Sequence, residues 1–204
     1  TLRLFLNGVQ EDTYQTPGTQ VTSSVVFTIG NFGTYNSQLF EGYMDEFRIS
    51  KGIARYGSTS LRTTQQVVTS SNSDSQVVTA NSTGGSSTTA SFGSDSYTGL
   101  LLNGDEVYGT STTFTATKGG SGTGPIGAAG TVTLTKGDGT SGTAASVPTQ
   151  RQGISAFGAN SYYFDGADYF TVASNASFGF GVGDFTIEMW VQRTADSAYS
   201  YIID

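Results

Sequence analysis

The sequence predicts an all-β protein built from antiparallel strands. Only 12% of the 204 residues are charged and 28 are glycine, a composition that favours strands joined by many turns. Threonine and valine recur throughout the chain, and their β-branched side chains suit a pleated sheet. No stretch shows the 3.6-residue periodicity of an amphipathic helix.

The composition also excludes several classes of chemistry. The chain has no cysteine and no histidine, so it can form neither a disulfide nor a zinc–thiolate site, and it lacks the general base of a Ser-His-Asp triad. Its net charge is −7, whereas nucleic-acid binding needs clustered positive charge. No apolar run reaches the roughly 20 residues of a membrane helix. We therefore expect neither a nucleic-acid partner nor membrane insertion.

Residues 1–56 form the first strand-rich segment. Leucines at alternate positions predict a strand at residues 2–6, and Asn7-Gly8 is a two-residue hairpin signal. The tail at residues 51–56 is expected to pack back on the last strand of the segment. The other strands are predicted at 25–29 and 40–50.

Residues 57–98 differ in composition, because charges nearly vanish and serine and threonine dominate. Gln66-Val67-Val68-Thr69 recurs as Gln76-Val77-Val78-Thr79, which is too short a pattern to predict a repeat fold. We interpret this segment as a Ser/Thr-rich linker with two short edge strands.

Residues 99–204 are strand-rich again. The glycine-rich stretch at 119–143 predicts loops around a single strand at 131–135. No helix start follows these glycines, so they do not predict a phosphate-binding loop. The other strands are predicted at 100–102, 161–166, 168–172 and 184–192, with 161–166 and 168–172 paired around a tight glycine turn.

Two groups of motifs stand out. One is Phe164–Val172 (FDGADYFTV) followed by Phe178–Val191 (FGFGVGDFTIEMWV). The other comprises LFLNGV at residues 4–9, FTIG at 27–30 and FEGYMDEFRISKGIARY at 40–56. The first group resembles the opening, and the second the closing part, of a laminin-G-like domain in the concanavalin A-like lectin/glucanase superfamily. The DEFRISKG run is similar to versions found in tailed-phage virion proteins. The resemblance implies antiparallel jelly-roll β-sandwiches.

The closing motif precedes the opening motif, which predicts a tandem array represented by two partial modules. Residues 1–56 would be the C-terminal part of one sandwich, 57–98 the linker and 99–204 the N-terminal part of the next. Both ends of the chain have strand patterns, so we interpret the sequence as a window of a longer polypeptide. Half a sandwich leaves a sheet face uncovered and edges unpaired. Either neighbouring sequence completes each half, or the halves complement one another within or between chains.

Trp190 and Glu188 are the candidate carbohydrate-binding residues. Both are expected on the face of their strand opposite Phe185, Ile187 and Met189. The apolar face of a sugar stacks on an indole while polar groups bind its hydroxyls. The alternative is that Trp190 covers a secondary core beneath loops. Scattered tyrosines are further candidate sugar or interface contacts.

Asp45, Asp165 and Asp168 are the candidate metal ligands, with calcium as the cofactor that the resemblance implies. In a regular strand Asp45 would point at the core, where a carboxylate needs a partner. That partner is either Ca²⁺, which prefers several oxygen ligands, or backbone N–H groups of a neighbouring loop. A bulge would instead turn Asp45 outward. Asp45 and Asp165 would belong to different modules of the array, which argues against a shared ion.

These observations predict a non-enzymatic module. Glycoside hydrolysis needs two carboxylates facing one another across a cleft, whereas Asp45 and Glu46 are adjacent and Glu188 is isolated on its strand. We expect a structural or binding module of a virion, such as a phage fibre or capsid decoration, or of a cell surface, with glycan binding as a further hypothesis. Its partners would be other virion or surface subunits in a homo-oligomer, together with cell-surface glycans. The alternatives are an assembly spacer without a ligand and a segment of a secreted bacterial adhesin, which would be extracellular.

Overall fold

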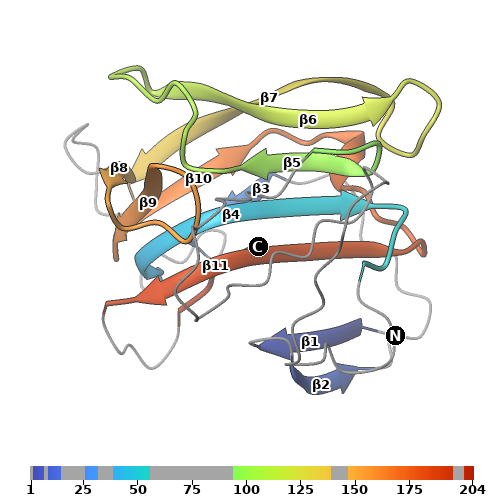
Figure 1. Cartoon of the computed structure of the whole chain (residues 1–204), viewed down its shortest axis with the longest axis horizontal. Helices are drawn as coiled ribbons and strands as arrows, with labels where there is room; N and C mark the ends of the chain where they lie inside the picture. The colour runs from blue at the N-terminus through green and yellow to red at the C-terminus, as the bar shows by residue number, and fades with distance from the viewer. Residues whose placement is uncertain are drawn as a thin grey trace, which may run out of the picture.

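The computed structural model describes residues 2–6, 9–14, 26–31, 39–55, 94–138, 147–194 and 200–204. These residues form an antiparallel all-β structure with the character of a β-sandwich (Figure 1), which confirms the predicted fold class at that level. Within this part of the chain the sole helical element is a 3-10 turn, η1 (Ala176–Phe178). No helix there has the length and apolar character needed to cross a membrane. The repeated Gln-Val-Val-Thr motif lies outside the described residues.

The strands of the described residues divide into two sheets. A separate hairpin pairs β1 with β2, and the other strands form one nine-stranded sheet. The strands are β1 (Leu2–Leu6), β2 (Val9–Tyr14), β3 (Phe27–Ile29), β4 (Glu41–Lys51), β5 (Thr98–Leu102), β6 (Thr113–Ser121), β7 (Ala128–Asp138), β8 (Thr149–Gln152), β9 (Asn160–Asp165), β10 (Asp168–Val172) and β11 (Phe185–Arg193).

Strand β4 is the centre of the large sheet. One of its edges pairs with β11 from Gly42 to Lys51. The other edge is shared, because its first half pairs with β9 and its second half with β5. The sheet then continues from β5 through β6, β7 and β10 to β3. Strand β4 belongs to the predicted first segment and its three partners to the last, so strands from both segments build one sheet within a single chain.

Strands β9 and β10 form as predicted, but they do not pair with each other as expected. Strand β9 pairs with β4 and β8, whereas β10 pairs with β7 and β3. After the turn, the chain therefore leaves the β4–β9–β8 part of the sheet and enters the part formed by β7, β10 and β3. Phe164 of β9 and Phe170 of β10 meet across the core, with ring centroids 5.2 Å apart. Burial of both rings favours this arrangement over a flat hairpin.

The core is rich in aromatic side chains. Tyr108, Phe114, Tyr162 and Phe170 contact one another with ring centroids 4.9–6.2 Å apart. Leu134 and other aliphatic residues of neighbouring strands complete the buried cluster. Such tilted and edge-to-face contacts stabilise the fold beyond the area that they bury.

A bulge in β4 decides which side chains face this core. Opposite Met189 of β11, the register of β4 slips by one residue. Glu46 occupies the extra position, with a positive φ of 52°. As a result Met44 and Phe47 are both buried in the core, while Asp45 faces outward. This is the bulge that the sequence left open as an alternative.

The glycine-rich stretch contains more strand than predicted, because β6 and β7 extend through several of its glycines. Gly119 and Gly137 lie within these strands. A Cβ at Gly119 would lie 1.8 Å from the carbonyl oxygen of Asp95, and one at Gly137 would lie 2.2 Å from the ring of Tyr169. These glycines therefore permit close packing within the sheet rather than loops.

Candidate functional site

The outward face of the sheet carries a pocket of about 400 Å³ where β4, β9 and β11 run side by side. We call it the Trp190 pocket. Trp190 lines this pocket and is 42% exposed. The other lining residues are Tyr43, Asp45, Gly153, Ile154, Ser155, Ala156, Ser161, Val191 and Gln192.

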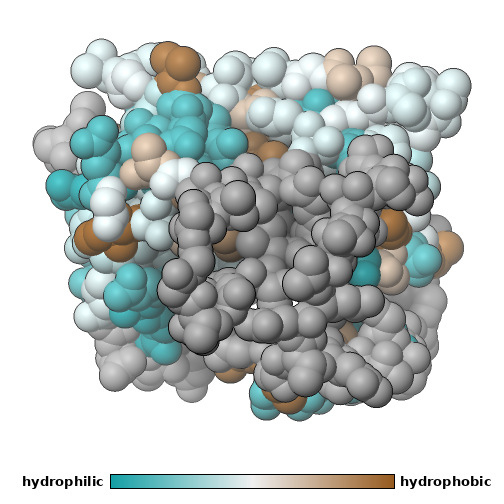
Figure 2. Space-filling view, viewed as in Figure 1, coloured by the Kyte–Doolittle hydropathy of each residue, from teal (hydrophilic) through white to brown (hydrophobic). Residues whose placement is uncertain are grey.

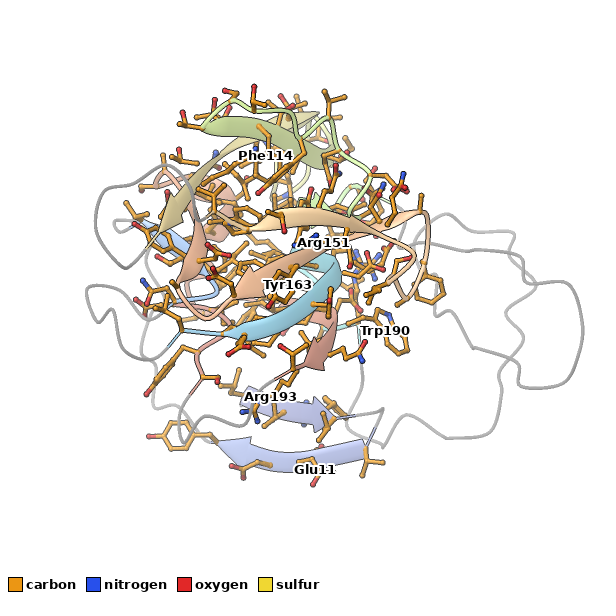
Figure 3. The ribbon with its side chains drawn as sticks, turned by 90° about the vertical axis from the view of Figure 1, so that its left-hand side faces the viewer. Glu11, Phe114, Arg151, Tyr163, Trp190 and Arg193 are labelled. Carbon is orange, nitrogen blue, oxygen red and sulfur yellow. The ribbon has the colours of Figure 1, made fainter. Side chains whose placement is uncertain are left out.

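The wall of the pocket is the loop between β8 and β9, residues 153–159. Phe157 of this loop meets Trp190 edge to face, with ring centroids 5.6 Å apart and planes at 72°. This contact packs the loop against the indole, and 42% of Trp190 stays exposed. Figure 3 labels Trp190 of β11 together with Tyr163 of β9 and Arg151 of β8.

Asp45 holds the loop from the floor of the pocket. Its Oδ2 atom accepts hydrogen bonds from the backbone N–H groups of Ala156 and Phe157, at 2.8 and 3.0 Å, and its Oδ1 atom accepts one from Glu46. Burial raises the pKa of the Asp45 carboxyl above its usual 3.8, although these N–H donors act in the opposite direction. The partner of this buried carboxylate is therefore the neighbouring loop, one of the two alternatives that the sequence left open.

A second carboxylate holds the same loop at its other end. The Oδ1 atom of Asp105 accepts a hydrogen bond from the side chain of Asn160 at 2.8 Å, and its Oδ2 atom accepts one from the backbone of Ala159. Gly158 has a positive φ of 66°, and a Cβ there would lie 2.5 Å from Asp105. The loop is thus anchored on both sides of Phe157.

Glu188 lies on the same face of β11 as Trp190, but its carboxylate is committed to two arginines. The Oε1 atom lies 2.5 Å from Arg48 and 3.6 Å from Arg55. Arg55 also pairs with Asp95 at 2.5 Å. All four side chains are at most 7% exposed. The network joins the tail after β4 to β11. Glu188 therefore stabilises the fold through its ion pairs, whereas the sequence predicts it as a sugar-binding residue.

The three candidate metal ligands do not come together. Asp165 and Asp168 flank the turn between β9 and β10, where Asp165 Oδ1 accepts the N–H of Ala167 and Asp168 Oδ2 that of Asp165. Asp165 lies opposite Glu41 at the start of β4, four residues before Asp45. The described residues contain no group of three or more acidic side chains placed to hold a metal ion. The geometry therefore gives the predicted calcium ion no shared site among them.

The site contains residues that the sequence did not single out. Phe157 follows Gly153-Ile154-Ser155-Ala156 in a short loop, and no periodic pattern marks it. Tyr43, by contrast, is one of the scattered tyrosines expected as sugar or interface contacts, and the predicted strand places it on the same face as Asp45, two positions later. Ile154 and Gln192 are recognisable only after the strand pairing is known.

The fold and the pocket together define the class of protein: an antiparallel β-sandwich with an aromatic pocket on the outward face of its sheet. No protein-family model, curated protein or solved structure matches the chain. The laminin-G-like resemblance therefore depends on the two groups of sequence motifs alone.

Proposed function

We propose that the protein is a non-enzymatic carbohydrate-binding module and that the Trp190 pocket binds the sugar. The observation that carries this proposal is the partly exposed indole of Trp190 beside polar pocket residues. A pyranose ring stacks on such an indole, and nearby polar groups bind its hydroxyls. A pure spacer would be expected to bury the indole.

Gln192 and Ser155 line the pocket together with Trp190 and suit sugar hydroxyls. Gln192 follows Trp190 by two residues on the same face of β11, and Ser155 lies in the loop wall. Asp45, which is buried at the floor, holds the loop wall in place through its hydrogen bonds to Ala156 and Phe157. No lysine or arginine is among the lining residues of the Trp190 pocket, so neutral sugars fit it better than acidic ones.

The wider setting that we propose is a virion or cell surface. The support is the similarity of the DEFRISKG run to tailed-phage virion proteins and the laminin-G-like resemblance of both motif groups. A phage fibre or capsid decoration uses such a module to attach to glycans, and a secreted adhesin would use it in the same way.

A screen of immobilised glycans tests the proposal. We expect the protein to bind at least one neutral glycan and Trp190→Ala to weaken that binding about tenfold or more, because stacking is lost. The matched control is Tyr169→Ala, which removes a half-buried aromatic ring from β10, outside the Trp190 pocket. Unchanged binding by Trp190→Ala, or no bound glycan, would overturn the proposal.

The hairpin of β1 and β2 favours a second role, assembly with further copies of the chain. Leu4 and Leu6 are 61% and 59% exposed, and Leu2 and Val9 are also exposed. On the face shown in Figure 2 the described surface is mainly teal and white with small separate brown areas. Apolar surface of the kind that the hairpin exposes marks an interface.

The assembly role is tested by measuring the molar mass in solution. We expect self-association that the double substitution Leu4→Thr and Leu6→Thr abolishes, since threonine keeps the strand propensity. A Val107→Thr variant, changed at a side chain that is 94% exposed outside the hairpin, is the control. A monomeric wild-type protein would contradict this role.

A further inference from the structure

The outward face of the sheet continues beyond the Trp190 pocket toward β8. Trp190 is followed two residues later by Gln192, which lies opposite Tyr43 of β4. Tyr43 in turn lies opposite Tyr163 of β9. Side chains two residues apart project from the same face of a strand, so Trp190, Tyr43 and Tyr163 share the outward face of three neighbouring strands.

The far end of this row is an aromatic pair capped by a cation. The rings of Tyr43 and Tyr163 have centroids 5.0 Å apart at an angle of 43°. The guanidinium of Arg151, on β8, lies 5.5 Å from the centroid of Tyr163. Both tyrosines are half-buried and Arg151 is exposed. The packing holds the rings in place and leaves part of their surface to solvent.

The hydroxyl of Tyr163 stays protonated at neutral pH. Burial raises its pKa above the usual 10, and the nearby carboxylate of Glu41 adds to the shift. A protonated phenol both donates and accepts a hydrogen bond, and Arg151 supplies further donors. Such groups complement the hydroxyls around a sugar ring.

We propose that Tyr163, with Tyr43 and Arg151, forms a second sugar subsite, so that the protein binds an oligosaccharide laid across the strands. This inference rests on the proposed glycan-binding function. Strands β11 and β9 are two strand spacings apart, about 10 Å, which is farther than one pyranose ring extends. One sugar therefore contacts Trp190 and a later unit of the same chain contacts Tyr163.

A glycan array in which each sugar is displayed in lengths from one to six units tests the second subsite. We expect the wild-type protein to bind the longer chains about tenfold more tightly than the single sugar. Tyr163→Ala should abolish this gain and leave single-sugar binding unchanged, whereas Trp190→Ala should weaken binding at every length. Tyr163→Thr keeps the strand propensity and should act like Tyr163→Ala if the alanine variant folds poorly.

The control is Tyr169→Ala, which removes a half-buried tyrosine from β10, a strand that pairs with β7 and β3. This variant should retain the full gain with chain length. Binding that is equal at all lengths, or a gain that survives both substitutions of Tyr163, would overturn the second subsite while the proposed function stands. Absence of binding at every length would overturn both.

Discussion

Asp45 and Ala156 are 111 residues apart in the chain, yet the carboxylate of the first accepts a 2.8 Å hydrogen bond from the backbone N–H of the second. The contact exists because the bulge at Glu46 turns Asp45 out of the core. This hydrogen bond connects β4, the strand that contains the closing motif, to the loop that carries Phe157. The shape of the Trp190 pocket thus depends on a residue that the sequence suggested as a metal ligand.

Replacing Asp45 by asparagine should loosen this loop. Asparagine has one carbonyl oxygen, so at least one of the buried N–H groups now bonded to Asp45 loses its acceptor. We expect a loss of about 1–3 kcal/mol in the free energy of unfolding, measured by urea denaturation, together with weaker sugar binding. Asp184→Asn, a change at an exposed carboxylate, should alter neither. Unchanged stability in Asp45→Asn would show that the loop is held by other contacts.

Glu188 should contribute mainly to stability. Substitution by glutamine leaves the guanidinium of Arg48 buried without its 2.5 Å ion pair. Breaking a buried pair from one side destabilises a protein by about 3–5 kcal/mol. We expect Glu188→Gln to lose stability in urea denaturation and to retain its affinity for sugar once folded. A loss of affinity in the folded variant would instead place Glu188 in the sugar site.

The double variant Arg48→Met with Glu188→Leu tests the same ion pair without leaving a buried charge at that position. It should be more stable than Glu188→Leu alone, because apolar replacements of a whole buried pair are tolerated better than its disruption. Additive losses in this double-mutant cycle would show that Arg48 and Glu188 do not interact appreciably in solution.

The local pattern of the sequence predicts much of the strand structure. Strand β11 alternates as expected as far as Trp190, with Ile187 packed against the core and Trp190 exposed, whereas Val191, predicted on the core face, is 40% exposed. The hairpin of β1 and β2 pairs as its leucine pattern and two-residue turn signal predict. These features depend on residues that are close in the chain, so the alternation of apolar and polar residues is enough to predict them.

Long-range contacts account for what the sequence could not supply. The pairing of β4 with β9 and β11 decides that Asp45 lies over the 153–159 loop, and nothing near Asp45 in the chain encodes this loop. The strand parity of Asp45 was also ambiguous, because one extra residue in a bulge reverses it. The sequence predicts loops at the glycines of β6 and β7. Glycine is needed there because Asp95 and Tyr169 pack closely against these strands, and both residues are distant in the chain.

Acid should weaken the protein through Asp95. Burial alone would raise the pKa of this carboxyl, but its bonds with Arg55 and Thr98 outweigh burial and hold the pKa below the usual 3.8. The folded state therefore binds the proton less tightly than the unfolded state, so the stabilisation is present above about pH 4 and is lost as the pH falls through the folded-state pKa.

The pH dependence of Asp95→Asn checks this assignment. The variant should be less stable than the wild-type protein at pH 7, and the difference should shrink as urea denaturation is repeated toward pH 3. Glu11→Gln, which removes an exposed carboxylate from β2, should keep the wild-type profile. A difference between Asp95→Asn and wild type that stays constant with pH would rule out the ion pair as the cause.

Two glycines in neighbouring strands should respond in opposite ways to alanine. A Cβ at Gly119 would lie 1.8 Å from the backbone carbonyl oxygen of Asp95, whereas a Cβ at Gly130 would meet no atom within 4 Å. Gly119→Ala must therefore displace the chain at Asp95 and with it the ion pair to Arg55, at a loss of about 1–3 kcal/mol or more. Gly130→Ala should gain about 0.5–1 kcal/mol, since alanine loses less conformational freedom on folding. Thermal denaturation of both variants measures the contrast, and equal midpoints would mean that β6 does not approach Asp95 as closely as described.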